Sequence, residues 1–146
     1  MAEFKFRLAT LLRLRETTRD ERRAELAAAY RTDQNLQQQL ARLAVELEEL
    51  KAVSRRAAGP GKVDVDQLVE AQRYQRTLES RQRQIIEERT SLAVEIERHR
   101  QTLLAADREV RTLEKLRETR HARHRQDENR REIKQLDEVA SLLALR

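Results

Sequence analysis

Two histidines in this sequence have a spacing that could support metal binding. His121 and His124 lie three positions apart, which places both imidazoles on one face of a helix. A zinc site usually needs four ligands, drawn from Cys, His, Asp and Glu, and the chain contains no cysteine. Because the sequence does not fix further ligands beside this pair, we interpret both histidines as solvated. We expect no metal site and no cofactor.

Motifs that bind phosphate groups or activate a nucleophile are missing from the sequence. Phosphate-binding loops require several glycines, and the only two glycines flank the only proline. The many Glu and Arg residues could act as acid–base pairs only in a pocket that excludes water. A chain with 39% charged and 3% aromatic residues has too few apolar side chains to build one. We therefore expect no catalytic residues and no enzymatic activity.

Gly59, Pro60 and Gly61 are the only strong helix breakers among the 146 residues. The remaining sequence is rich in Arg, Glu, Gln, Leu and Ala, a composition typical of long helices and coiled coils. The sequence therefore predicts an all-α fold, a single antiparallel coiled-coil hairpin over residues 1–146. We expect a first helix at about 5–57, a turn at 58–64 and a second helix at about 65–144.

Apolar residues recur at heptad spacing in both predicted helices. A tight turn pairs residues whose numbers sum to about 121 or 122, as an antiparallel coiled coil requires. The same rule places Asp33 opposite Arg89, and we predict an ion pair there that helps to fix the register. The apolar pairs are Leu8–Leu113, Leu12–Val110, Leu26–Ile96, Ala29–Leu92, Leu36–Ile85 and Leu43–Leu78, and further seam positions of the second helix are Ala71, Leu103 and Ala106.

The second predicted helix is longer than the first. Residues 117–132 are almost all polar or charged, and apolar residues return at helical spacing from Ile133 onward. We expect the second helix to be unpaired from about residue 118 and to end in a short amphipathic segment. An exposed apolar helix end is typical of a partner site, and self-association of the chain is the alternative.

Phe4 and Phe6 alternate just before the first predicted helix. These two aromatic side chains could fasten the N-terminus to the second helix. They could equally dock a partner. The sequence leaves both interpretations open.

The net charge of +5 arises from 31 basic and 26 acidic residues, and acidic residues interrupt most arginine runs. A nucleic-acid-binding protein normally gathers its basic residues into a patch, so we expect no nucleic-acid partner. No apolar stretch approaches the roughly 20 residues that span a membrane, and the N-terminus lacks the features of a secretory signal. We therefore expect a cytoplasmic protein with no direct membrane span.

Four groups of residues, in this order, resemble the FliJ family of flagellar type III export proteins, and the resemblance covers the whole chain. The first is the opening Phe4-Lys5-Phe6-Arg7-Leu8 with Leu11, Leu12 and Arg15-Glu16, and the second is Tyr74 with Leu78. The others are Leu113-Glu114-Lys115-Leu116 and Lys134-Gln135-Leu136-Asp137-Glu138-Val139-Ala140.

This resemblance implies a cytoplasmic stalk, similar to the coiled coil of the F1-ATPase γ subunit, which associates peripherally with the inner face of the cell membrane at the flagellar base. It implies three partners: the hexameric flagellar export ATPase, the cytoplasmic domain of the export gate, and export chaperones. The stalk protein of virulence-type secretion systems is one alternative. A generic self-associating coiled coil is another.

The resemblance also assigns residues to two of these partners. The ATPase would bind the open end, at Phe4, Phe6, Leu8, Leu136, Asp137 and Glu138. The gate would bind near the turn, at Gln39, Leu43, Leu50, Tyr74 and Leu78. Glu46 and Thr77 occupy positions where some relatives are expected to carry aromatic residues, so the gate contact would use other side chains.

Overall fold

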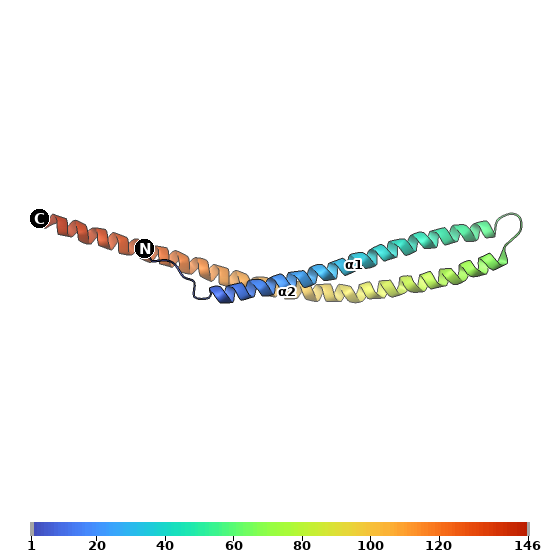
Figure 1. Cartoon of the computed structure of the whole chain (residues 1–146), viewed down its shortest axis with the longest axis horizontal. Coiled ribbons are helices and arrows are strands. Elements are labelled where there is room, and N and C mark those ends of the chain that lie inside the picture. The colour runs from blue at the N-terminus through green and yellow to red at the C-terminus, as the bar shows by residue number, and fades with distance from the viewer. Residues whose placement is uncertain (1, 146) are drawn as a thin grey trace. The chain divides into compact units, whose positions relative to one another are not determined.

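A computed structural model describes residues 2–145, which form two helices joined by one turn (Figure 1). Helix α1 spans Ala9–Ala57 and helix α2 spans Val65–Ala144. The two helices pack against each other, and residues 2–145 include no strand. The prediction of an all-α helical hairpin is therefore confirmed.

The described chain divides into two compact units. Unit 1 combines the described residues of Met1–Arg23 with those of Thr102–Arg146, and unit 2 is Ala24–Gln101. Each unit joins a stretch of α1 to a stretch of α2. Early residues thus pair with late ones in both units, as an antiparallel arrangement requires.

The chain reverses at the Gly-Pro-Gly sequence. α1 ends at Ala57, two residues before this sequence. Gly61 has φ = 126°, a conformation that residues with a Cβ atom rarely adopt, which explains a glycine at this position. The backbone N–H of Gln67 donates to Asp64 Oδ1 at 3.1 Å, so Asp64 caps the N-terminus of α2.

The core of both units is a narrow apolar seam. Its most buried residues are Val110 in unit 1, with 0% exposure, and Ile85 in unit 2, with 1%. Every buried hydrophobic residue of the described chain except Ala57 is a seam position that the heptad rule predicted. Burial of an aliphatic side chain contributes roughly 1.5–3 kcal/mol, so this seam holds the helices together. Its members are Leu12, Ala29, Leu36, Ala71, Leu78, Ile85, Ile96, Ala106 and Val110.

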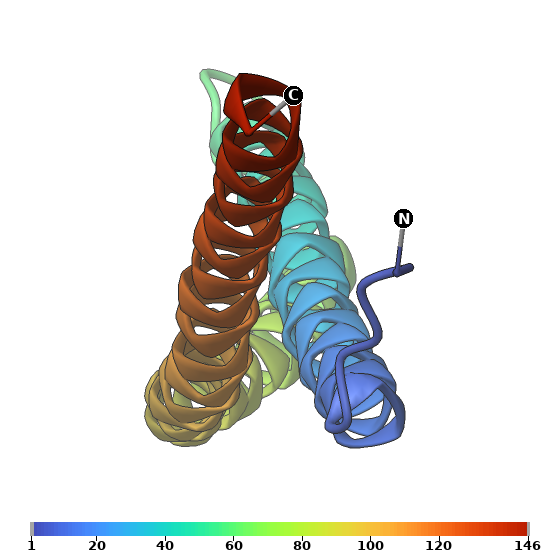
Figure 2. The ribbon, with the colours of Figure 1, turned by 90° about the vertical axis from the view of Figure 1, so that its left-hand side faces the viewer.

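α1 begins at Ala9, later than the predicted start at about residue 5. The preceding segment is not helical (Figure 2). Within it Phe4 and Phe6 are partly buried, and exposed residues alternate with them. A helix would turn the two phenylalanines roughly 200° apart, so the contact of both with α2 disfavours a helix here. The outward-facing residues are Glu3, Lys5 and Arg7.

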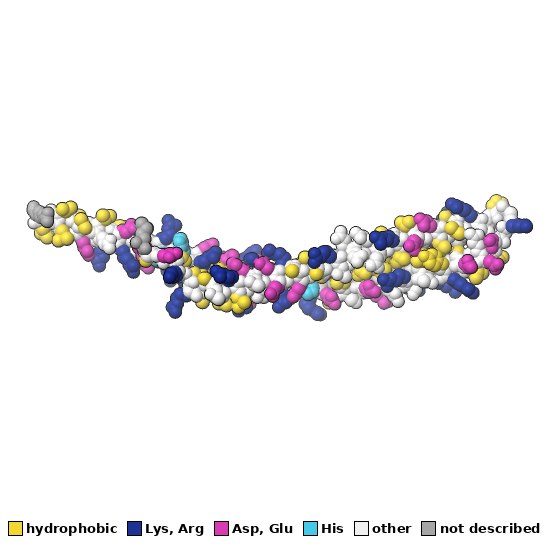
Figure 3. Space-filling view, viewed as in Figure 1, with side chains coloured by type: hydrophobic (Ala, Val, Ile, Leu, Met, Phe, Trp, Pro, Cys, Tyr) yellow, Lys and Arg dark blue, Asp and Glu magenta, His cyan; other side chains and the backbone are white. Residues whose placement is uncertain are grey.

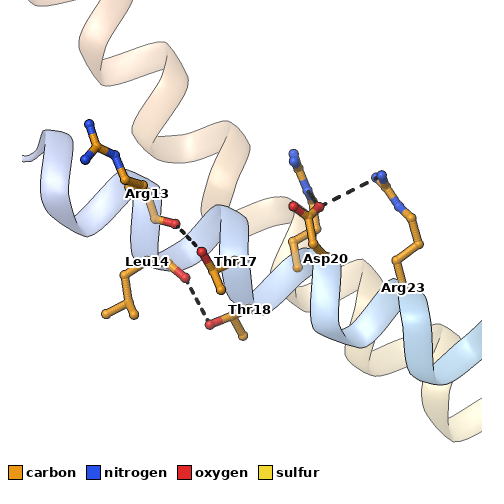
Figure 4. A network of polar contacts seen from close by, with 7 residues as sticks. Arg13, Leu14, Thr17, Thr18, Asp20 and Arg23 are labelled. Atoms are coloured by element: carbon orange, nitrogen blue, oxygen red, sulfur yellow. Dashed lines mark hydrogen bonds and ion pairs between the residues drawn. The ribbon is translucent and has the colours of Figure 1, made fainter.

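Polar side chains near the start of α1 are satisfied within the helix itself (Figure 4). The hydroxyls of Thr17 and Thr18 donate to backbone carbonyls four residues earlier, at 3.0 and 3.1 Å. Asp20 lies 4.0 Å from the guanidinium of Arg23. The two threonines therefore meet their hydrogen-bonding needs within α1, whereas Arg15 pairs with Glu109 of α2 at 3.3 Å.

The last part of α2 is solvent-exposed along its whole surface. Every side chain from 129 to 145 is exposed, whereas the N-terminal segment contacts α2 as far as His124. The unpaired stretch therefore begins later than the predicted residue 118. Residues 2–6 have no regular structure, and they precede a turn in which the Ala9 N–H donates to the Phe6 carbonyl oxygen at 3.2 Å. The physical reason is that a non-helical segment can advance up to about 3.3 Å per residue and a helix only 1.5 Å, so this segment reaches further along α2 than a helical start would. No described helix is long and apolar enough to cross a bilayer.

Candidate partner-binding surfaces

The seam of unit 2 contains an ion pair between Asp33 of α1 and Arg89 of α2. Arg89 Nε donates to Asp33 Oδ1 at 2.9 Å, and Arg89 Nη2 lies 3.4 Å from Asp33 Oδ2. The hydrogen bond to Asp33 raises the pKa of Arg89, partial burial lowers it, and Coulombic attraction to Asp33 raises it further. These are the two residues that the register rule placed opposite each other. Their two-point geometry suits a contact that defines register.

A second polar contact links the helices of unit 2. Arg100 Nε donates to the Tyr30 hydroxyl at 2.7 Å. The guanidinium carbon of Arg100 also lies 5.6 Å from the centroid of the Tyr30 ring, within the range of a cation–π interaction. Tyr30 is therefore engaged within unit 2, although its side chain is 40% exposed.

Residues assigned to the export gate by resemblance lie in unit 2 and differ in exposure. Tyr74 is 51% exposed, and its hydroxyl donates to Glu46 Oε2 at 3.4 Å. Leu78, one helical turn further along α2, is 6% exposed and belongs to the seam. Tyr74 thus offers surface to a partner, and Leu78 supports the helix packing beneath it. The other three residues are partly exposed: Gln39, Leu43 and Leu50.

An apolar surface beside the turn was not found from the sequence. Val63, Val65 and Val69 have exposed fractions of 52%, 63% and 42%. None of them occupies a seam position of the heptad pattern, and that is why periodicity missed them. The sequence did contain one indication of this surface. Three valines fall within residues 63–69, directly after the turn, where polar residues are usual. Exposed apolar surface of this kind suits a protein partner.

Phe4 docks on the two histidines of α2. Its ring centroid lies 4.9 Å from that of His121, with the rings at 72°, and 5.6 Å from that of His124. His124 Nε2 also lies 3.0 Å from the Ala2 carbonyl oxygen. Of the two open interpretations of this segment, the structure shows the first, in which Phe4 fastens the N-terminus to the second helix.

Phe6 contacts Arg120, the residue that precedes His121 on α2. The guanidinium carbon of Arg120 lies 5.9 Å from its ring centroid, a distance typical of cation–π contacts. The sequence showed that the two phenylalanines alternate, but it did not show which residues of α2 they contact. Those residues are histidines and an arginine, which do not belong to the heptad core. The histidines serve here as flat surfaces for Phe4. Within residues 2–145, no group of three or more His, Cys, Asp or Glu side chains could hold a metal ion.

The C-terminal end of α2 carries an exposed apolar surface. Figure 3 shows hydrophobic side chains gathered at this end. Asp137 and Glu138 are exposed beside them. His124 and Leu136 are twelve positions apart, about 18 Å along a helix, so the N-terminal and C-terminal groups assigned to one ATPase site form two separate surfaces of unit 1. The exposed apolar residues are Ile133, Leu136, Val139, Leu142, Leu143 and Leu145.

The chain belongs to the class of antiparallel helical hairpins, and exposed apolar side chains lie beside its turn and at the C-terminal end of α2. Residues 4–146 match the family described as flagellar FliJ protein. The chain therefore belongs to this family and is a component of flagellar protein export. No curated protein and no solved structure matches the chain.

Proposed function

We propose that this protein is a stalk and adaptor of the flagellar type III export apparatus. In this function it binds the hexameric export ATPase and the cytoplasmic domain of the export gate, assists export chaperones, and acts at the inner face of the cell membrane without bond chemistry of its own. The family match over residues 4–146 carries the proposal. That match also favours the flagellar apparatus over a virulence-type system.

The unpaired end of α2 is the best candidate for the ATPase contact. Its exposed leucines can fill apolar pockets, and every described residue from 129 onward is exposed. A single helix inside a ring presents different side chains to different subunits. The subunits then make unequal contacts, and unequal contacts favour different conformational states in each subunit.

Substitution of Leu136 and Leu143 by serine is expected to weaken ATPase binding. Each leucine is about two-thirds exposed, at 67% and 65%, so the fold remains intact while apolar contact is lost. We expect affinity for the purified export ATPase, measured by calorimetry, to fall about tenfold or more, with a parallel loss of ATPase stimulation.

Leu14→Ser is the matched control, because Leu14 is a 60% exposed leucine of α1 in the same unit. It should leave binding and stimulation unchanged, and circular dichroism should show equal helicity in all variants. A chain truncated after Arg117 should neither bind nor stimulate. Equal stimulation by the truncated and full chains would exclude the unpaired end as the ATPase contact.

The gate contact is proposed for the surface around Tyr74. Tyr74→Ala removes an exposed aromatic ring, so binding to the isolated cytoplasmic domain of the gate should weaken about tenfold in a pull-down titration. Tyr30→Ala is the control with the same change of side chain, and it should bind the gate domain normally. If both variants bind equally well, the gate contact does not involve Tyr74.

Self-association remains a second candidate function because six apolar side chains at the end of α2 are exposed. A stable dimer in sedimentation at micromolar concentration, lost on Leu136→Ser and Leu143→Ser, would favour it over the ATPase contact.

A further inference from the structure

Two segments that lie together in unit 1 are rich in positive charge. Residues 3–7 and 115–125 contain seven Lys or Arg and two Glu, and we call these two segments the basic collar. The other 24 basic and 24 acidic side chains of the sequence balance. The collar therefore accounts for the whole net charge of +5.

The contacts of the two phenylalanines assemble the collar from distant parts of the sequence. Phe4 and Phe6 face α2, where they meet His121, His124 and Arg120. The two basic residues of this segment alternate with the phenylalanines and are exposed. The segment thus adds the exposed side chains of Lys5 and Arg7 to those of α2.

The cationic groups of the collar are exposed, although one of them, that of Arg120, lies over the Phe6 ring. All seven are exposed, and none forms an ion pair with another described residue, in contrast to Arg111, which lies 3.0 Å from Asp107 earlier on α2. Helical side chains advance roughly 100° per residue, so those of α2 point in directions spread around its circumference. The five on α2 are Lys115, Arg117, Arg120, Arg123 and Arg125, and Figure 3 shows basic side chains over this stretch.

We propose that the basic collar binds an acidic protein surface that encloses the helix. A flat anionic membrane or the side of a duplex can touch only one face of a helix and would leave part of the collar unused. Carboxylates arranged around the helix can pair with guanidinium groups on every side, and arginine favours two-point contacts with carboxylates. The inference rests on the proposed function, since it supplies the ATPase end with its electrostatic contact.

The test compares two triple variants with the same change in charge. Arg117→Gln, Arg123→Gln and Arg125→Gln remove three charges from the collar. Arg73→Gln, Arg76→Gln and Arg83→Gln remove three charges from exposed residues of α2 in unit 2. Binding to the export ATPase and to three probes, poly-L-glutamate, a DNA duplex and phosphatidylserine vesicles, is measured over a range of salt concentrations.

The full chain should bind poly-L-glutamate more tightly than duplex or vesicles, with an affinity that falls as salt rises. The collar variant should lose about tenfold or more in affinity for poly-L-glutamate and for the ATPase, and the control variant less than about threefold. Equal losses in both variants, or tighter binding to duplex or vesicles, would overturn the proposal.

The ATPase measurement separates this inference from the function on which it rests. If the ATPase binds the full chain and the collar variant equally well, the collar proposal fails and the proposed function stands. If the ATPase does not bind the full chain or either of the two variants, the proposed function fails. Poly-L-glutamate then still decides whether the collar recognises an acidic polypeptide.

Discussion

Replacing Ile85 with alanine is expected to lower the free energy of unfolding by about 2–4 kcal/mol. Ile85 is 1% exposed at the centre of the unit 2 seam, opposite Leu36 in the register. Removing its outer carbons takes apolar contact from both helices and leaves a void that a narrow seam has few side chains to fill. Urea denaturation followed by circular dichroism at 222 nm measures the change.

The neighbouring residue provides the control. Ile86 is 49% exposed, so Ile86→Ala should change the free energy of unfolding by less than about 1 kcal/mol. Both substitutions replace isoleucine by alanine in a helix and share the same gain in helix propensity. The difference between them therefore measures burial alone, and equal losses from the two would mean that residue 85 does not face α1.

The fold could be predicted from few residues because the turn fixes which residues of an antiparallel helix pair face each other. The turn lies at Gly59, Pro60 and Gly61. Heptad geometry then requires that the numbers of any two facing residues have the same sum. The buried positions Leu36, Ile85 and their equivalents follow that sum, as does the pair of Asp33 and Arg89. No long-range information beyond the turn was needed.

The docking of the N-terminal segment could not be predicted in the same way. Phe4 and Phe6 bind histidine and arginine side chains, whose contacts with aromatic rings follow no helical period. Heptad counting placed Leu78 in the seam, where it is buried, but it does not say which exposed side chains, such as Tyr74, a partner contacts.

Reversing the charge at either end of the Asp33–Arg89 pair is expected to destabilise unit 2. In Asp33→Arg two guanidinium groups face each other in a seam where the native side chains are only about one-third exposed, at 27% and 34%. Arg89→Asp likewise opposes two carboxylates. Both variants should melt at a lower temperature than the native chain in calorimetry. Added salt should recover part of the loss, since it screens repulsion.

The exchange of the two residues tests whether the effect belongs to the pair. A chain with both Asp33→Arg and Arg89→Asp restores opposite charges and should recover most of the melting temperature. A pair of equivalent surface charges on unrelated faces would show additive losses instead. Additive losses in the exchange variant would show that Asp33 and Arg89 do not interact in solution.

Register is a separate property from stability, and an apolar replacement distinguishes the two. Asp33→Leu with Arg89→Leu should keep or raise the melting temperature, because desolvated ion pairs often gain little over packed apolar side chains. A shift in helix pairing would therefore cost less free energy in a seam of leucines than in a seam in which Asp33 must face Arg89.

The chain has no cysteine, so spin labels at Ala44→Cys and Arg76→Cys, both exposed, report the distance between the helices without interference. One narrow distance distribution in the native pair and a broader one in the leucine variant would assign register to the ion pair. Equally narrow distributions would assign it to the turn alone.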